Sequence, residues 1–194
     1  MIKVGITGGI GSGKTSIAKL FELLKVHVYY SDAEAKRLML ENKALKQDLI
    51  DLLGTSIYEA SGALNRAYMA QKIFSDRFLL KKVNALVHPA VEADFMEFCE
   101  KHKTEKYVLK EAAILMETGL FKALDKIILV TSNEELKIER VVQRDGSKRE
   151  EVLSKMKQQW SDEEKKKWAD FIIENNQDAL IIPQVLQLHQ KFNS

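Results

Sequence analysis

Residues 8–15 read GGIGSGKT and follow the apolar run IKVGIT at residues 2–7. The stretch fits the pattern G-x-x-x-x-G-K-[ST], which forms a phosphate-binding loop between a strand and a helix. Its glycines allow positive φ angles and close backbone approach, so successive N–H groups can surround a phosphate at the start of the helix. A tight glycine turn with an incidental lysine is the alternative, and the strand-to-helix context argues against it. The sequence therefore predicts a site for a nucleoside triphosphate.

The side chains at the end of this phosphate loop have separate expected roles. Lys14 is expected to reach the β- and γ-phosphates, and the Thr15 hydroxyl is expected to bind Mg²⁺. From the loop we predict these ATP-binding residues: Gly9, Gly11, Ser12, Gly13, Lys14, Thr15 and Ser16.

Strand-like and helix-like patterns alternate along the rest of the chain. Residues 15–24 have apolar residues at helical spacing, and residues 33–103 are mostly helical in pattern. Strands are expected at 2–7, 26–30, 107–112, 126–130 and 171–174. Alternation of this kind predicts an α/β fold, in which a parallel sheet of about five strands is covered by helices on both faces.

The helical block is too long for a simple crossover between neighbouring strands. We therefore predict one unit over residues 1–194, with a helical substrate-binding insertion and a lid. The predicted parts are a nucleotide-binding core at 1–40 and 105–194, an acceptor-binding insertion at about 41–104 and a lid at about 144–168.

Local signals predict several helix ends. The stretches 132–135 (SNEE) and 161–164 (SDEE) have the spacing of capping boxes. Pro89 is expected to start a helix, because its missing N–H costs nothing in a first turn. Gly54 is expected to end one.

Composition excludes several classes of protein. The 194 residues include 30 Lys and Arg against 28 Asp and Glu, a net charge of +2, so there is no electrostatic footprint of a nucleic-acid binder. No apolar run has the length of a membrane span. The one cysteine, Cys99, cannot form an internal disulfide and is expected to be a small buried residue. We expect a cytoplasmic protein without nucleic-acid or membrane partners.

Asp32 comes directly after the second expected strand, whose carboxyl end should lie at the ligand-binding edge of the sheet. A carboxylate there can accept a hydroxyl proton and orient the oxygen for attack on the γ-phosphate. The equally weighted alternative is an N-cap for the following helix.

Arg140 and Arg144 are four residues apart, so both should lie on one helix face. Beside a phosphate loop, two guanidinium groups can neutralise the transferring phosphoryl group while a lid excludes water. A solvated face paired with Glu139 and Asp145 is the alternative. The charge run at 163–167 is expected to be a solvated helix face.

Glu111, at the end of the third expected strand, could hold Mg²⁺ through water beside Thr15. A buried ion pair with a lysine is the alternative at even weight.

A regulatory GTPase is the alternative from a different functional class, because residues 51–54 (DLLG) match D-x-x-G. However, Asp51 lies in a helical pattern, and residues 42–45 (NKAL) do not match the guanine box N-K-x-D. Another nucleoside or nucleotide kinase is the alternative among kinases.

Motifs along nearly the whole chain resemble those of the dephospho-coenzyme A kinase family. They are the phosphate loop preceded by Thr7, SDAEAKR at 31–37, LNR at 64–66, VNALVHP at 83–89, EAAILME at 111–117, RVVQRD at 140–145 and IENN at 173–176. The chain departs from the family pattern at Tyr30, Lys36, Glu111, Ala113 and Gln177.

This resemblance implies a P-loop kinase fold, a reaction and a set of site residues. The reaction is ATP plus dephospho-coenzyme A giving ADP plus coenzyme A, with Mg²⁺, in a monomer or weak homo-oligomer. The implied catalytic residues are Asp32, Lys14, Arg140 and Arg144, and Arg140 and Asn175 join the ATP-binding set. The implied acceptor-binding residues are Thr7, Asp32, Lys36, Arg66, Asn84, His88 and Glu117.

Overall fold

The computed structural model describes the backbone of residues 1–194 and all side chains except those of Phe74, Ser75 and Arg77. The chain forms two compact units. Unit 1 consists of Met1–Tyr30 and His102–Ser194, and unit 2 is Ser31–Lys101. The acceptor-binding role predicted for about 41–104 stays a prediction.

The sheet of unit 1 confirms the predicted α/β fold. Its strands are β1 (Ile2–Thr7), β2 (Val28–Tyr30), β3 (Tyr107–Glu111), β4 (Lys126–Thr131) and β5 (Phe171–Glu174). All pairs are parallel, in the order β2-β3-β1-β4-β5. Strands β2 and β3 lie on one side of β1, and β4 and β5 lie on the other, so the strand order reverses at β1. Ligands of open parallel sheets bind at the carboxyl ends of the strands beside such a reversal.

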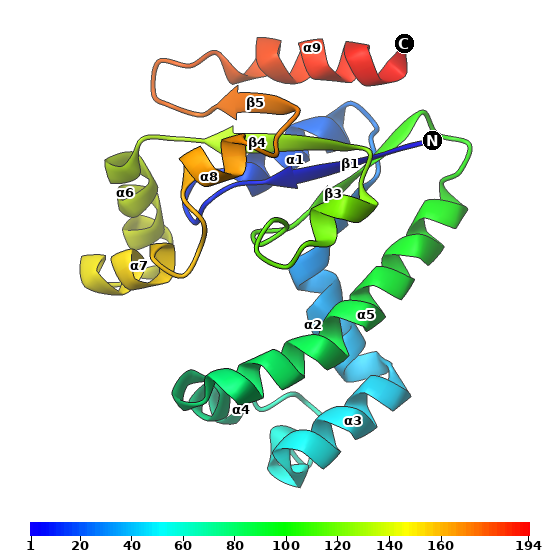
Figure 1. Cartoon of the computed structure of the whole chain (residues 1–194), viewed down its shortest axis with the longest axis vertical. Coiled ribbons are helices and arrows are strands. Elements are labelled where there is room, and N and C mark those ends of the chain that lie inside the picture. Colours follow the sequence, from blue (N-terminus) through cyan, green and yellow to red (C-terminus); the bar gives the residue numbers. More distant parts are fainter. The chain divides into compact units, whose positions relative to one another are not determined.

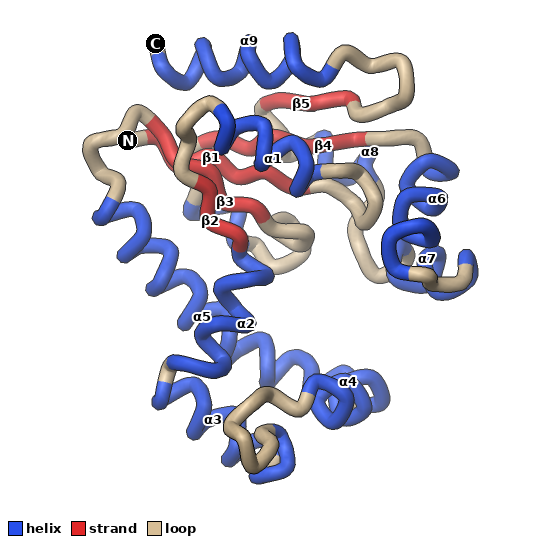
Figure 2. Tube along the Cα trace, turned by 180° about the vertical axis from the view of Figure 1, so that it is seen from behind, coloured by secondary structure: helices blue, strands red, loops and turns tan.

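Helices cover both faces of this sheet (Figures 1 and 2). Helix α1 (Lys14–Leu23) and helix α9 (Ile181–Asn193) contact each other, and α8 (Asp162–Lys166) lies on the face opposite to α1. The main core lies under α1 and α9, where Phe21 is fully buried and meets Tyr107 edge-on at 6.5 Å between ring centroids. This packing fixes α1, and therefore the phosphate loop that precedes it.

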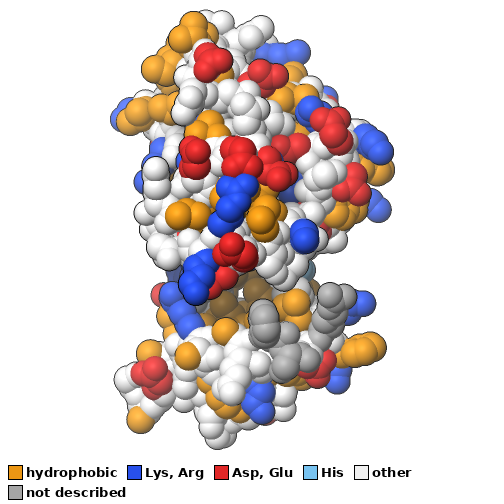
Figure 3. All heavy atoms as spheres, turned by 90° about the vertical axis from the view of Figure 1, so that its left-hand side faces the viewer, with side chains coloured by type: hydrophobic (Ala, Val, Ile, Leu, Met, Phe, Trp, Pro, Cys, Tyr) orange, Lys and Arg blue, Asp and Glu red, His pale blue; other side chains and the backbone are white. Residues whose placement is uncertain are grey.

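A smaller apolar cluster joins the phosphate loop to two further helices. Helix α6 (Glu134–Asp145) and helix α7 (Arg149–Met156) bury Ile138, Val141 and Val152 against each other, and the side chain of Ile10 packs on this cluster. Figure 3 shows acidic and basic side chains interspersed on one side of the molecule. Arg149 of α7 and Glu135 of α6 form an exposed ion pair. Residues 157–161 and α8 follow α7, and together we call them the strap.

Unit 2 is helical. Its helices are α2 (Ser31–Glu41), α3 (Lys43–Leu53), α4 (Arg66–Ser75) and α5 (Arg77–Lys101), with a 3₁₀ turn at Thr55–Ile57. Helix α5 contacts the other three. Gly54 ends α3 with φ of +90°, as predicted. Asp51 therefore lies in a helix, which removes the basis of the GTPase interpretation.

Pro89 lies inside α5, so the prediction that it starts a helix is wrong. A proline inside a helix removes a hydrogen bond and costs about 3 kcal/mol or more. The same helix buries a stripe with four-residue spacing, which is formed by Val83, Val87, Val91, Phe95 and Cys99. Burial of such side chains stabilises by about 1.5–3 kcal/mol each, which exceeds the cost of the proline. Cys99 is thus buried, as predicted.

One of the two predicted capping boxes is wrong. Ser161 and Glu164 form the box at the start of α8 as expected. At 132–135, however, α6 starts after Asn133, and the Ser132 hydroxyl donates to the Asn175 carbonyl oxygen at 3.0 Å. The Ser132 hydroxyl is thus bonded to a residue distant in sequence and does not cap the start of α6.

Candidate active site

The phosphate loop is held where only glycine fits. Gly11 and Gly13 have φ of +79° and +85°, in the left-handed region. A Cβ atom on Gly11 would lie 2.2 Å from the Lys137 carbonyl oxygen, and one on Gly13 would lie 2.1 Å from the Asn175 side-chain nitrogen. The glycines that the sequence assigns to phosphate binding therefore also allow α6 and the end of β5 to contact the loop.

Polar contacts hold the carbonyl groups on one side of the loop. The buried Asn175 donates from Nδ2 to the Ser12 carbonyl oxygen at 2.7 Å. Arg140 donates to the Gly11 carbonyl oxygen at 3.5 Å, to the Asn175 carbonyl oxygen at 3.0 Å and to the Ser132 hydroxyl at 3.3 Å. With these oxygens occupied, the loop can present its N–H groups to an anion.

The Glu111 carboxylate lies beside both the lysine and the threonine of the loop. Its Oε1 accepts a hydrogen bond from the Thr15 hydroxyl at 3.2 Å and lies 3.5 Å from Lys14 Nζ. The Lys14 and Glu111 side chains are 15% and 5% exposed. The ion pair that the sequence offered as an alternative is thus present, and it lies on the same oxygen as the contact with Thr15.

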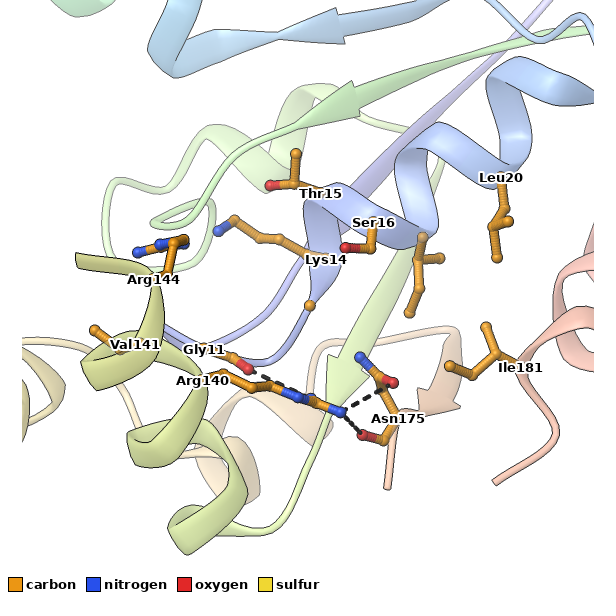
Figure 4. A pocket seen from close by; sticks show the side chains of 12 residues that line it. Gly11, Lys14, Thr15, Ser16, Leu20, Arg140, Val141, Arg144, Asn175 and Ile181 are labelled. Carbon is orange, nitrogen blue, oxygen red and sulfur yellow. Dashed lines mark hydrogen bonds between the residues drawn. The ribbon is translucent and has the colours of Figure 1, made fainter. Parts of the chain in front are cut away.

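A cavity of about 550 Å³ lies beside the loop (Figure 4). Lys14 from α1 and Arg144 from α6 extend toward one end of it, whereas Leu20 and Ile181 lie at the other end. Its lining residues are Gly11, Gly13, Lys14, Thr15, Ser16, Ile17, Leu20, Arg140, Val141, Arg144, Asn175 and Ile181. One end is therefore cationic and the other apolar, which suits a molecule with charged phosphates and a flat base.

The two predicted arginines differ in their surroundings. Arg140 is engaged by the loop and by Asn175, as described above. Arg144 is 64% exposed and donates from Nε and Nη2 to both carboxylate oxygens of Asp145, at 2.7 and 2.8 Å. These hydrogen bonds raise the pKa of Arg144 and lower the pKa of Asp145. Arg144 can leave this exposed partner for a ligand, whereas Arg140 is part of the wall of the site.

Thr7 and Glu117 lie near the ends of β1 and β3. The buried Thr7 hydroxyl donates to the Ala113 carbonyl oxygen at 3.5 Å. Glu117 Oε1 lies 3.0 Å from Lys165 Nζ and accepts from the Trp160 backbone N–H at 2.9 Å. Lys165 is fully buried, so the prediction that 163–167 is a solvated face is wrong for its central residue. A buried ammonium group requires such a partner because desolvation is costly.

Tyr30 ends β2, and its Cα pairs with that of Glu111 across the sheet. Burial, followed by the nearby carboxylates of Glu22 and Glu111, raises the pKa of the Tyr30 hydroxyl above its ordinary value. The phenol therefore stays protonated at neutral pH and cannot accept a proton. Asp32, two residues later, remains the candidate proton acceptor in this stretch.

The other predicted acceptor residues lie in unit 2. Helix α2 starts at Ser31, so Asp32 is exposed in its first turn, and the N-cap alternative is wrong. Lys36 is exposed on the same helix, and Arg66 is exposed at the start of α4. Asn84 and His88 are half-buried one turn apart on α5. The structure thus places each residue on a helix of this unit, and their roles stay predictions.

Three polar residues beside the phosphate loop were missed from the sequence. Lys137, on α6, donates to Asp162 of the strap at 2.8 Å, and both side chains are largely buried. Gln159 accepts a hydrogen bond from the Ile10 backbone N–H at 2.8 Å. Lys137 lies one helical turn before the apolar Val141, so the spacing of this segment already placed Lys137 on the inward face of the helix. Gln159 lies in a charged stretch without a motif, and the capping-box spacing at 161–164 assigns no role to Asp162.

Comparison with known proteins identifies what the chain is similar to. The sequence profile of the dephospho-CoA kinase family matches residues 2–180. A dephospho-CoA kinase from Bacteroides fragilis is 36% identical over 187 residues, covering 96% of this chain and 91% of the relative.

Solved structures share the fold of this chain. TT1252 from Thermus thermophilus has a TM-score of 0.88 at 34% identity, covering 100% of this chain and 98% of that one. The dephospho-CoA kinase from Campylobacter jejuni, at 22% identity, has a TM-score of 0.73 with 98% and 96% covered and shows the shared fold. Within the described residues, every helix is too short or too polar to span a bilayer.

The Lys165–Glu117 pair generates a prediction about stability. Replacing Lys165 by Met keeps the length of the side chain but leaves the Glu117 carboxylate buried without its cation. We expect the free energy of unfolding to fall by about 3–5 kcal/mol, as when one partner of a buried ion pair is removed. Urea denaturation of Lys165→Met measures this loss.

Lys166→Met is the matched control, because Lys166 is 40% exposed and its partner Glu163 is 80% exposed. An exposed pair contributes about 0–1 kcal/mol. Equal stability of the two variants would contradict the role assigned to the buried pair.

Proposed function

The chain belongs to the dephospho-CoA kinase family, and we infer that it transfers the γ-phosphate of ATP to the ribose 3′-hydroxyl of dephospho-coenzyme A, giving ADP and coenzyme A. The family match carries this proposal, because it spans residues 2–180 and includes the phosphate loop. We further propose that the protein acts in the cytoplasm as a monomer or weak homo-oligomer.

We propose that ATP occupies the cavity beside the phosphate loop. The phosphates lie at the end reached by Lys14 and Arg144, where the N–H groups of the loop and the start of α1 favour negative charge. The base lies between Leu20 and Ile181 at the apolar end. Gly9, Gly11, Ser12, Gly13 and Ser16 supply backbone or hydroxyl groups, and Asn175 and Arg140 form the wall.

Thr15 and Glu111 suit Mg²⁺. Their oxygens are 3.2 Å apart, and hydroxyl and carboxylate oxygens are the ligands that this cation prefers. We propose that Thr15 binds the ion directly and that Glu111 binds it through water. The ion would supply positive charge to the β- and γ-phosphate oxygens. Lys14, released from Glu111, would then face the phosphates.

Asp32 is our proposed proton acceptor. It follows β2 by two residues, and β2 ends in register with Glu111. The exposed carboxylate can orient the acceptor hydroxyl and take its proton as the oxygen attacks phosphorus. We propose that Thr7, Lys36, Arg66, Asn84, His88 and Glu117 bind the acceptor, as the family resemblance implies.

Arg144 is our proposed source of mobile positive charge for the transferred phosphoryl group. Arg140 supports the phosphate loop, because its guanidinium donates to the Gly11 and Asn175 carbonyl oxygens. As part of the cavity wall, it would also cover the nucleotide. The two arginines therefore contribute differently, although both are needed for transfer.

The function itself is tested by an assay of ADP release with Mg·ATP and a series of acceptors. We expect turnover with dephospho-coenzyme A and none with ordinary nucleosides, nucleotides or shikimate. Mass spectrometry should show coenzyme A as the product. Turnover with another nucleoside instead would overturn the proposed acceptor, and hydrolysis of GTP without any acceptor would favour a switch protein.

Asp32→Asn separates chemistry from structure. Asn keeps the size of the side chain but removes the charge and the proton acceptor, so kcat should fall by about 10²- to 10⁴-fold. The melting temperature and the affinity for ATP should stay unchanged. Asp48→Asn, the same change at an exposed position of unit 2, is the control. A normal kcat for Asp32→Asn would exclude the proposed base.

Arg144→Ala should lower kcat by about 10²- to 10³-fold, because preorganised charge at the transition state is lost. Its melting temperature should not change, since the side chain is exposed and bonded to its neighbour. Arg140→Ala should lower both kcat and the melting temperature. Arg149→Ala, in the exposed pair with Glu135, is the control. An effect of Arg144→Ala on stability alone would support the solvated-face alternative.

A further inference from the structure

Ile10 of the phosphate loop is held from outside the nucleotide cavity. Its side chain packs on the apolar cluster of α6 and α7, and its backbone N–H donates to Gln159 Oε1 at 2.8 Å. A second cavity of about 490 Å³ borders this side of the loop and is lined by Gly9, Lys137, Gln159 and Asp162, among others. Gln159, which accepts from the Ile10 amide, is thus not among the residues that line the proposed ATP cavity.

The strap that carries Gln159 is fastened on both sides of that residue. After it, Asp162 accepts from Lys137 at 2.8 Å, and the buried Lys165 pairs with Glu117 at 3.0 Å. Before it, Val152 is buried against α6. These contacts anchor the segment that carries Gln159, and its side chain therefore has a fixed position beside the loop.

The contact matters because the loop is otherwise easy to deform. Glycines occupy positions 8, 9, 11 and 13, and glycine restricts the backbone less than any other residue. Asn175 and Arg140 hold the carbonyl groups of Ser12 and Gly11. Gln159 accepts from the Ile10 amide, which precedes these two carbonyl groups. The contacts therefore fix the path of the chain on both sides of Gly11.

We propose that Gln159 is a positioning residue for the ATP site, acting through the Ile10 amide. It keeps the loop in the conformation whose later N–H groups converge on phosphate. Without it, the loop would adopt that conformation only part of the time, and the affinity for ATP would fall by the same fraction. Bound phosphates then order the loop, so the transfer step itself is little affected. The inference rests on the proposed use of this loop for ATP.

The test compares Gln159→Met with Gln158→Met. Methionine keeps the length of the side chain and removes the accepting oxygen, and Gln158 is an exposed neighbour in the same turn. Titration calorimetry with Mg·ATP should show a dissociation constant about 3- to 10-fold higher for Gln159→Met, the effect of one neutral hydrogen bond. Gln158→Met should match the unmodified protein.

Steady-state kinetics and melting curves separate positioning from general structural damage. For Gln159→Met, the KM for ATP should rise by the same factor, while kcat, the KM for dephospho-coenzyme A and the melting temperature stay nearly constant. Equal ATP affinity in the two variants would overturn the proposal. So would a joint rise of both KM values with a lower melting temperature. Gln159→Ala serves by the same criteria if the methionine variant does not fold.

This experiment also separates the positioning role of Gln159 from the proposed transfer of phosphate to dephospho-coenzyme A. The calorimetric titration needs no acceptor, so it tests Gln159 even if the unmodified protein does not phosphorylate dephospho-coenzyme A. Conversely, normal transfer by the unmodified protein with equal ATP affinity in both variants would leave the function intact and reject the role of Gln159.

Discussion

The phosphate loop runs so close to α6 and to the residue after β5 that Gly11 and Gly13 have no room for a side chain. The neighbouring groups are the Lys137 carbonyl and the Asn175 amide, both more than a hundred residues later in the chain. The first strand, loop and helix therefore do not form a finished nucleotide site by themselves. The site exists once β4, α6 and β5 have assembled beside them, so its geometry depends on the completed sheet of unit 1.

Short-range patterns predicted most of the fold. The three inner strands, β1, β3 and β4, are mostly apolar and largely buried on both faces, and such runs are recognisable without knowing their neighbours. The phosphate loop was predictable for the same reason, because its glycines and Lys14 are adjacent in sequence. The capping box at Ser161 and the helix end at Gly54 also depend only on nearby residues.

Features that depend on distant partners were predicted poorly. Lys165 lies in a run of charges that reads as solvated, and its burial depends on Glu117, which approaches from another loop. Ser132 has the spacing of a helix cap, but the Asn175 carbonyl takes its hydroxyl. Pro89 reads as a helix start because the buried stripe that keeps α5 continuous is a tertiary effect. In the site, spacing indicated Arg140 and Arg144 as equivalent, and only their partners distinguish them.

The position of Glu111 gives the phosphate loop a counter-ion from the same chain. The positive charge of Lys14 is balanced by the Glu111 carboxylate, 3.5 Å away. An anion that enters alone must compete with this carboxylate for the lysine and is repelled by it. Under the proposed role of Glu111, an anion that arrives with a divalent cation would bring a new partner for this carboxylate, and Lys14 would then become available to the anion. With that role, the pair would select against small free anions and in favour of a metal-complexed polyphosphate, before any part of the ligand beyond its phosphates is recognised.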